Sequence, residues 1–143
     1  MDIRPLTPDY AVSPQIGLED LAAIRAAGFA MVIDNRPDAE IPAELHTDGM
    51  RRAALAAGLE FVANPVIGGA LTMQNVAAQA EAMAQAGGPV FAYCASGNRC
   101  SIVWALTQAG RRPVDQLIAT AARHGYNLEH LRPQIEMLAA RKD

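Results

Sequence analysis

A cysteine and an arginine flank four small or polar residues in the segment YCASGNRCS, residues 93–101. Cys94 is expected at the carboxyl end of a buried strand, and a helix is expected to begin at about Arg99. A thiol near a helix N-terminus and beside a guanidinium has its pKa lowered from about 8.5 into a reactive range. A thiolate next to a guanidinium is a nucleophile suited to a substrate that bears an oxyanion. The spacing therefore predicts Cys94 as the catalytic nucleophile and Arg99 as the catalytic anion clamp.

The four residues between this pair are predicted to bind the substrate. They are Ala95, Ser96, Gly97 and Asn98. Small side chains let the backbone curl so that successive N–H groups point inward, which makes an anion nest reinforced by the helix dipole. The alternative is that Cys94 is a small apolar residue buried at a strand end, the commonest fate of a free cysteine. The glycine and the arginine at these offsets favour the functional interpretation.

Three further residues are candidates for the same site. Arg36 and Asp38 follow another predicted strand, and both are predicted to reach the substrate. Asp38 is then a substitute proton donor, or else a solvated turn residue after a proline; Arg36 faces the anion, or else pairs with a neighbouring aspartate. Cys100 is either a resolving thiol that forms a disulfide with Cys94, or a small side chain packed under the loop, which is the more common role. A disulfide needs Cα atoms within about 7 Å.

Short apolar runs alternate with segments of helical periodicity along the chain. Strands are predicted over 10–12, 29–33, 59–63 and 89–93, and helices over 18–27, 43–57, 73–86, 99–109 and 113–124, with a helical tail from 128 that is interrupted near Pro133. This alternation predicts one α/β domain over 1–143, with a parallel central sheet and helices on both faces. Ligands in such folds bind at the carboxyl ends of the strands. The segments 35–38, 64–69 and 94–99 are therefore expected to line one crevice.

Several separated segments carry a resemblance to a known family: YAVSPQI at 10–16, DNRPD at 34–38, NPV at 64–66, the 93–101 loop, WAL at 104–106 and GYNL at 125–128. Together they resemble the bacterial beta-lactamase-hydrolase-like phosphatase-like domains, also described as a sulfurtransferase family. The Cys-x4-Arg loop itself is similar to that of rhodanese-type sulfurtransferases and is one residue shorter than the Cys-x5-Arg loop of tyrosine and dual-specificity phosphatases. The resemblance implies a cysteine-phosphatase-like fold with Cys94 as nucleophile and Arg99 as anion clamp.

The chain departs from that family at two positions of the loop. Ala95 stands where the family commonly has arginine, so one positive charge is missing. Cys100 stands where the family commonly has serine. A serine hydroxyl can stabilise a thiolate, and a thiol is a weaker donor.

The residues of the facing loop bear on the choice between sulfur transfer and phosphoryl transfer. A phosphatase of this type needs an acid to protonate its leaving group, and residues 63–72 contain no carboxylate. Expulsion of sulfite or a thiolate needs no such acid. The sequence therefore predicts a thiol-dependent sulfurtransferase, in which Cys94 takes a sulfane sulfur from a small anionic or persulfide substrate and passes it to an acceptor thiol. The alternatives are a phosphatase with a Cys94 phosphoryl intermediate and a non-catalytic anion-binding module.

Composition limits the remaining possibilities. The chain has 143 residues, 51% hydrophobic and 19% charged, with a net charge of −3, which indicates a globular protein and argues against nucleic-acid or anionic-membrane partners. No apolar run reaches the roughly 18 residues of a membrane-spanning helix, and the first residues lack a signal pattern. A cytoplasmic location with free thiols is expected. The three histidines lack ligand spacing, so no metal and no cofactor are predicted; the oligomeric state is left open.

Overall fold

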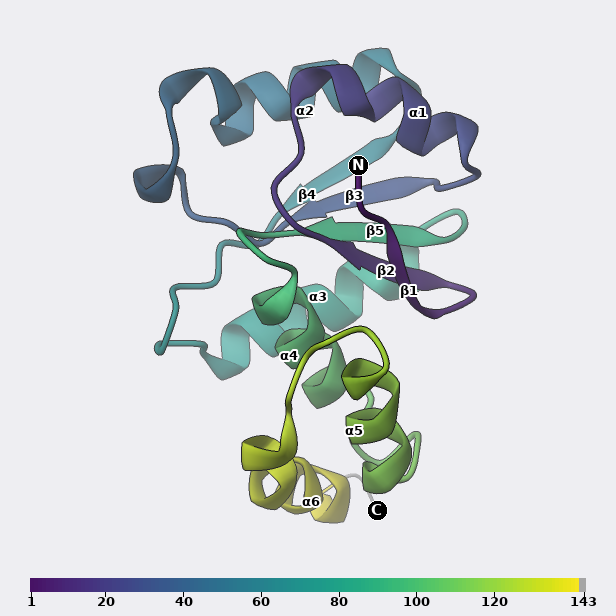
Figure 1. Ribbon diagram of the computed structural model, residues 1–143, viewed down its shortest axis with the longest axis vertical. Coiled ribbons are helices and arrows are strands. Elements are labelled where there is room, and N and C mark those ends of the chain that lie inside the picture. The colour runs from purple at the N-terminus through teal and green to yellow at the C-terminus, as the bar shows by residue number, and fades with distance from the viewer. Residues whose placement is uncertain (142–143) are drawn as a thin grey trace.

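A five-stranded sheet forms the centre of the protein in a computed structural model that describes residues 1–141 (Figure 1). The strands are β1 (Arg4–Thr7), β2 (Tyr10–Ser13), β3 (Met31–Asp34), β4 (Glu60–Ala63) and β5 (Val90–Tyr93). Their order across the sheet is β1-β2-β5-β3-β4, with β1 antiparallel to β2 and every other neighbouring pair parallel. The predicted α/β fold with a mostly parallel sheet is confirmed. The edge strand β1, which contains a proline, was not predicted.

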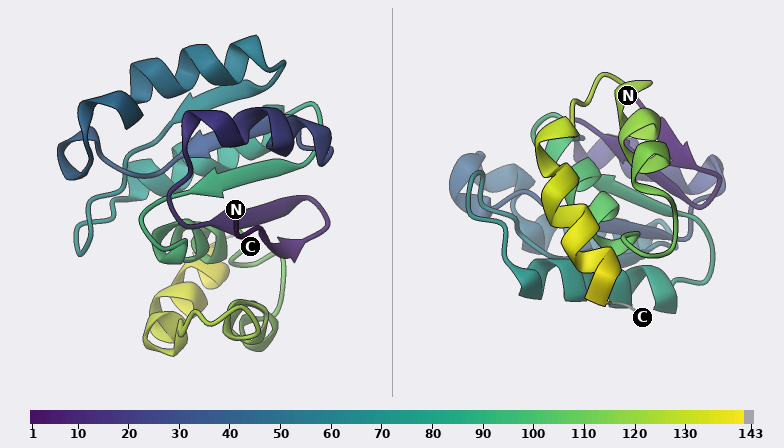
Figure 2. Two further views of the ribbon diagram at one scale, coloured as in Figure 1. Left: turned by 45° about the horizontal axis from the view of Figure 1, so that its top comes forward. Right: turned by 90° about the horizontal axis from the view of Figure 1, so that it is seen from below.

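Helices cover both faces of this sheet. They are α1 (Leu21–Ala26), α2 (Thr47–Ala56), α3 (Met73–Gln85), α4 (Asn98–Thr107), α5 (Val114–Ala122) and α6 (Arg132–Arg141). Figure 1 shows α1 and α2 on one face and α3 and α4 on the other, and Figure 2 shows α5 and α6 on the far side of α4 from the sheet. No helix within residues 1–141 has the length and apolarity that crossing a membrane requires.

Strand β5 and the first three residues of β3 (31–33) consist of apolar or aromatic residues, which suits strands that pack against helices on both faces. Val32 and Phe91 belong to the core under α1 and α2, whereas their neighbours Ile33 and Ala92 belong to the core under α3 and α4. Successive side chains of a strand point to opposite faces. Cys94, which follows β5, lies in the core on the α3 and α4 side.

Two predicted helical segments begin as 3-10 turns in the structure. The helix expected over 43–57 begins only at Thr47, because residues 38–40 and 43–45 form separate 3-10 turns, η2 (Asp38–Glu40) and η3 (Ala43–Leu45). The tail is helical from residue 129 and changes next to Pro133, as expected, from a 3-10 turn, η4 (Glu129–Leu131), to α6. Pro133 lies in the first turn of α6, where its missing N–H has no helical partner to lose.

Candidate active site

The carboxyl ends of the parallel strands lie level with one another at one edge of the sheet. Ser13 and Asp34 both pair with Tyr93, and Ala63 pairs with Asp34. The loops that leave β2, β3, β4 and β5 therefore start side by side, and α4 begins among them. This register places the predicted loop of Cys94 next to the segments that follow the neighbouring strands.

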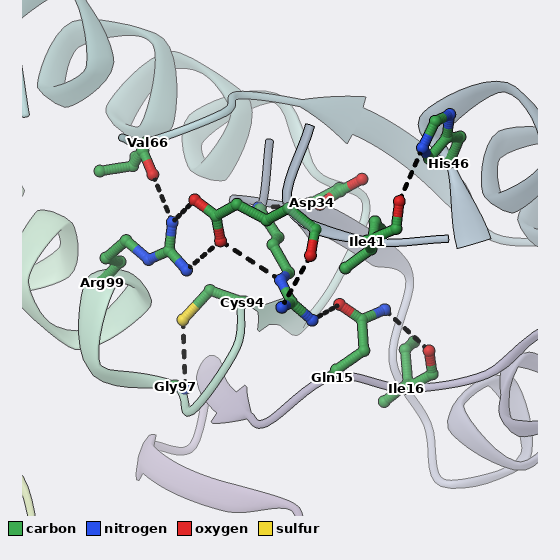
Figure 3. Close-up of polar contacts among 11 residues, drawn as sticks. Gln15, Ile16, Asp34, Ile41, His46, Val66, Cys94, Gly97 and Arg99 are labelled. Carbon is green, nitrogen blue, oxygen red and sulfur yellow. Dashed lines mark hydrogen bonds and ion pairs between the residues drawn. The ribbon is translucent and has the colours of Figure 1, made fainter. Parts of the chain in front are cut away.

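The loop after Cys94 curls around its sulfur (Figure 3). The Gly97 N–H donates a hydrogen bond to Cys94 Sγ at 3.1 Å, and the Ser96 and Cys100 amides also bond to this sulfur. Gly97 has a φ of 93°, in the left-handed region that favours glycine. A Cβ at this position would collide with the Tyr126 hydroxyl. Glycine is therefore required both by the turn and by the close approach of a neighbouring side chain.

The Cys94 thiol is ionised at neutral pH because its pKa is lowered to about 5. The largest cause is a hydrogen bond with the Cys100 side chain; burial opposes it, and backbone hydrogen bonds from Cys100, Ser96 and Gly97 lower the pKa further. Cys94 is fully buried. A buried cysteine that packs only against hydrocarbon has a raised pKa and is inert, whereas this environment favours a reactive thiolate.

Cys100 is the donor to that thiolate from the first turn of α4. Burial raises its own pKa well above the usual range, and the neighbouring Cys94 raises it further. Cys100 therefore stays protonated while Cys94 is ionised. Both cysteines are free. The structure thus shows Cys100 packed under the loop, with its thiol hydrogen-bonded to Cys94. The disulfide between the two cysteines stays a prediction.

Replacing Cys100 with alanine is expected to raise the pKa of Cys94, because the largest stabilising contact of the thiolate is lost. The rate of Cys94 alkylation by iodoacetamide, followed over pH 4 to 9, reports this pKa. Below the new pKa the thiol is protonated, so the variant should alkylate several-fold (roughly tenfold per pKa unit) more slowly than the wild type at pH 6. Cys100→Ser keeps a hydroxyl donor and is the matched control. Equal pKa values in the alanine and serine variants would contradict the donor role of this side chain.

Arg99 closes the loop and is held by a carboxylate that the sequence analysis did not single out. Its Nη1 donates to Glu40 Oε2 and to the Val66 carbonyl, and its Nη2 donates to Glu40 Oε1, each at 2.8 Å. Figure 3 shows the hydrogen bond from Arg99 to the Val66 carbonyl. The hydrogen bond with Glu40 raises the pKa of Arg99 and lowers that of the carboxyl. The available signal was the position of Glu40 four residues after Arg36, in the segment that follows β3.

Arg36 and Asp38 have other partners. Arg36 pairs with Glu40 at 3.3 Å and donates to Gln15 Oε1 at 3.2 Å. The Asp38 carboxylate accepts from both the backbone N–H and the hydroxyl of Thr47, at 2.8 and 2.9 Å, at the start of α2. The Arg36 guanidinium thus pairs with a glutamate, whereas the Arg36 backbone N–H donates to Asp34. The Asp38 carboxylate is bonded to the first residue of α2.

A buried amide network holds the strand ends in place. Gln79 of α3 accepts hydrogen bonds from Asn35 and Asn64, which follow β3 and β4, and donates to the Tyr10 hydroxyl. The Tyr10 hydroxyl in turn donates to the Cys100 carbonyl at 3.0 Å. Because unpaired buried polar groups are costly, this network fixes the positions of the loops relative to α4.

An open hollow of about 550 Å³ lies against the outer side of the loop. It is lined by Arg4, Pro14, Ala95, Ser96, Asn98, Gly125 and Tyr126. Three of the predicted substrate-binding residues therefore face a space large enough for a small molecule. Within residues 1–141 no group of three or more His, Cys, Asp or Glu side chains is placed to hold a metal ion.

Comparison with known proteins identifies related sequences and structures. Residues 2–111 match the family described as "Beta-lactamase hydrolase-like protein, phosphatase-like domain". A beta-lactamase hydrolase-like protein of Xylella fastidiosa is 32% identical over 130 residues, which are 90% of this chain and 30% of that protein. The chain thus spans less than a third of the length of this relative.

Two solved structures are similar over nearly the whole chain. A candidate phosphatase from Neisseria meningitidis is 31% identical, with a TM-score of 0.83 over 96% of this chain and 99% of its own. Kinase-associated phosphatase, solved with its catalytic cysteine replaced by serine, is 10% identical and has a TM-score of 0.73 over 92% of this chain and 86% of its own. The second similarity shows the fold alone.

The prediction of a sulfurtransferase was wrong, since the matched family is phosphatase-like and the 31% identical structure is that of a candidate phosphatase. It relied on the absence of a carboxylate in residues 63–72. A missing acid limits which leaving groups an enzyme can expel, because only those of low pKa depart unprotonated. It does not change which anion the amides and the guanidinium bind.

Proposed function

Because this chain belongs to the family of the beta-lactamase hydrolase-like protein, phosphatase-like domain, we propose that it is a cysteine-dependent phosphatase that hydrolyses phosphate monoesters through a Cys94 phosphoryl intermediate. The proposal concerns the activity of this chain and not that of its longer relatives. Kinase-associated phosphatase, which has the same fold, has a catalytic cysteine.

The observation that carries the proposal is the ionised Cys94 inside inward-pointing amides, with a pKa of about 5. A thiolate at neutral pH is a strong nucleophile. The surrounding N–H groups, the amino end of α4 and the Arg99 guanidinium favour the negative charge of a phosphoryl group. The same groups that stabilise the thiolate are thus placed to stabilise the oxygens of the transferred group.

The reaction then has two displacements at phosphorus. In the first, Cys94 Sγ forms a bond to phosphorus while the bond from phosphorus to the ester oxygen breaks, and the alcohol leaves as its anion. In the second, water attacks phosphorus, loses a proton to solvent, and releases inorganic phosphate and the Cys94 thiolate. Arg99 and the loop amides hold the phosphoryl oxygens through both steps.

The leaving group determines which substrates react. Residues 63–72 offer no carboxylate, Asp38 is bonded to Thr47, and Glu40 is bonded to Arg99. With no free carboxylic acid near Arg99 among these residues, leaving groups that are stable as anions are favoured. We therefore propose aryl phosphates, and other phosphates with acidic leaving groups, as the substrate class.

The proposal is tested by incubating the protein with p-nitrophenyl phosphate and phenyl phosphate near pH 6. We expect release of inorganic phosphate, a rate that falls steeply from the first substrate to the second, and a phosphoryl adduct on Cys94 in the intact mass after acid quench. A weak dependence on the leaving group would contradict the proposed substrate class. Absence of both turnover and adduct would instead support the non-catalytic anion-binding module.

A further inference from the structure

One edge of the Arg99 guanidinium donates hydrogen bonds to Glu40, and another edge donates none to the described residues. A guanidinium carries five N–H donors in a planar fork. Two donors on Nη1 bond to Glu40 and Val66, and one on Nη2 bonds to Glu40. The Nε–H and the second Nη2–H, which lie side by side on the other edge, have no hydrogen bond to residues 1–141. That edge matches two oxygens of a phosphoryl group.

Glu40 is itself fixed from the other side. Arg36 Nε donates to Glu40 Oε1, and its Nη2 donates to the Glu40 carbonyl, both at 3.3 Å. Arg36 also donates to Gln15, whose backbone N–H donates to the Ala95 carbonyl at 3.3 Å. Figure 3 shows the contact of Gln15 with Ile16 on the opposite side of the site from Arg99. Glu40 is therefore held by Arg36 on one side and by Arg99 of the Cys94 loop on the other.

The arrangement does not suit Glu40 as a proton donor. Both carboxylate oxygens accept hydrogen bonds from the guanidinium of Arg99, and these bonds lower the pKa of the carboxyl. A carboxyl that donates a proton to a leaving group must be protonated at the working pH. Glu40 is instead an ionised anchor, 33% exposed, against an arginine that is only 15% exposed.

We propose that Glu40 is a positioning residue, which binds one edge of Arg99 so that the Nε–Nη2 edge faces the phosphoryl group of the substrate. Arg36 and Gln15 hold Glu40 in this position. The inference rests on the proposed function, because it assigns Arg99 to the phosphoryl oxygens. It also gives Arg36 a part in the site that requires no contact with substrate.

Replacing Glu40 with glutamine tests this role. The neutral amide has nearly the same shape, but its NH₂ group opposes the N–H groups of Arg99, so the guanidinium loses its fixed orientation. We expect kcat/KM for p-nitrophenyl phosphate to fall about 10- to 100-fold. The fall should be the same for phenyl phosphate, and the rate of Cys94 alkylation should be unchanged. The matched control is Glu44→Gln, which changes an exposed glutamate on η3 in the same way. This variant should keep the activity of the wild type.

A double-mutant cycle shows whether Glu40 acts through Arg99. In an Arg99→Ala background, Glu40→Gln should cause no further loss of kcat/KM, because the group that it orients is gone. An equal loss in both backgrounds would overturn the proposal. So would a loss that is larger for phenyl phosphate than for p-nitrophenyl phosphate, since that pattern identifies a proton donor. Unchanged activity of Glu40→Gln would overturn it as well.

A binding measurement separates failure of this inference from failure of the proposed function. Tungstate is an oxyanion with the shape of phosphate, and its binding can be followed by calorimetry without turnover. If the wild type hydrolyses no phosphate ester but binds tungstate, the proposed function fails, and a 10-fold or greater loss of affinity in Glu40→Gln still supports positioning. Equal affinities, or no tungstate binding by the wild type, would overturn the positioning role.

Discussion

Cys94→Ser is expected to abolish phosphate release from p-nitrophenyl phosphate, with a loss of about 10⁴-fold or more. The pKa of the Cys94 thiol is about 5, so the nucleophile of the wild type is fully ionised at pH 7. A serine hydroxyl in the same place is un-ionised at this pH, and a neutral hydroxyl is a weak nucleophile. The measurement is the initial rate of phosphate release at pH 6 to 7, together with the intact mass after acid quench.

The same variant should keep the binding site for the anion. Arg99 and the loop amides are unchanged, so Cys94→Ser should still bind tungstate, and its melting temperature should stay close to that of the wild type. Cys100→Ser, which changes the other cysteine in the same way, should retain activity. Substantial turnover by Cys94→Ser would show that Cys94 is not the nucleophile.

Acid should inactivate the wild type only at low pH. The folded-state pKa of Cys94 is lowered from 9.0 to about 5, so the thiolate is present above that value and is lost as the pH falls through it. The acidic limb of the kcat/KM profile should therefore contain a group that titrates near pH 5. It should move to higher pH in Cys100→Ala, in parallel with the change in the rate of alkylation.

Arg99→Lys is expected to lower kcat/KM by about 10²- to 10³-fold while leaving Cys94 ionised. Lysine keeps the positive charge but has no planar edge with two parallel donors. The contacts that lower the pKa of Cys94 come chiefly from Cys100 and from the Ser96 and Gly97 amides, so alkylation at pH 6 should remain fast. The measurement is kcat and KM for p-nitrophenyl phosphate beside the alkylation rate of the same preparation.

The control for this substitution is Arg51→Lys. Arg51 is a partly exposed residue of α2 that pairs with Asp48, and its replacement should leave the kinetic parameters unchanged. Equal activity of Arg99→Lys and wild type would show that a point charge is enough and that the orientation of the guanidinium has no role. A parallel loss of activity and of alkylation would instead place Arg99 among the groups that ionise Cys94.

Local patterns in the sequence were enough to predict the fold class and the loop around Cys94. Apolar runs such as 89–93 identify strands that are buried on both faces, and a small-residue loop followed by helical periodicity indicates the start of a helix. These features depend on neighbours along the chain, because backbone curvature and burial follow from local residue type. The family resemblance rested on the same local segments, and the match of residues 2–111 to the family confirms it.

The partners of those residues were decided by the tertiary structure. Arg99 and Glu40 are 59 residues apart and meet only because β3 lies beside β5 in the sheet. Asp38, two residues before Glu40, turns to Thr47 instead. Which of two nearby carboxylates reaches the guanidinium depends on the path of a short 3-10 turn, and charge patterns along the chain do not specify that path.

By itself, the sequence determined that a thiol and a guanidinium stand at the end of a buried strand with amides between them. Only the fold decided that Cys100 donates to this thiol and that a glutamate binds one edge of the guanidinium. The physical reason is that strand and helix formation are governed by interactions between residues close in sequence. Hydrogen bonds between loops instead require the sheet order that brings distant segments within about 3 Å of each other.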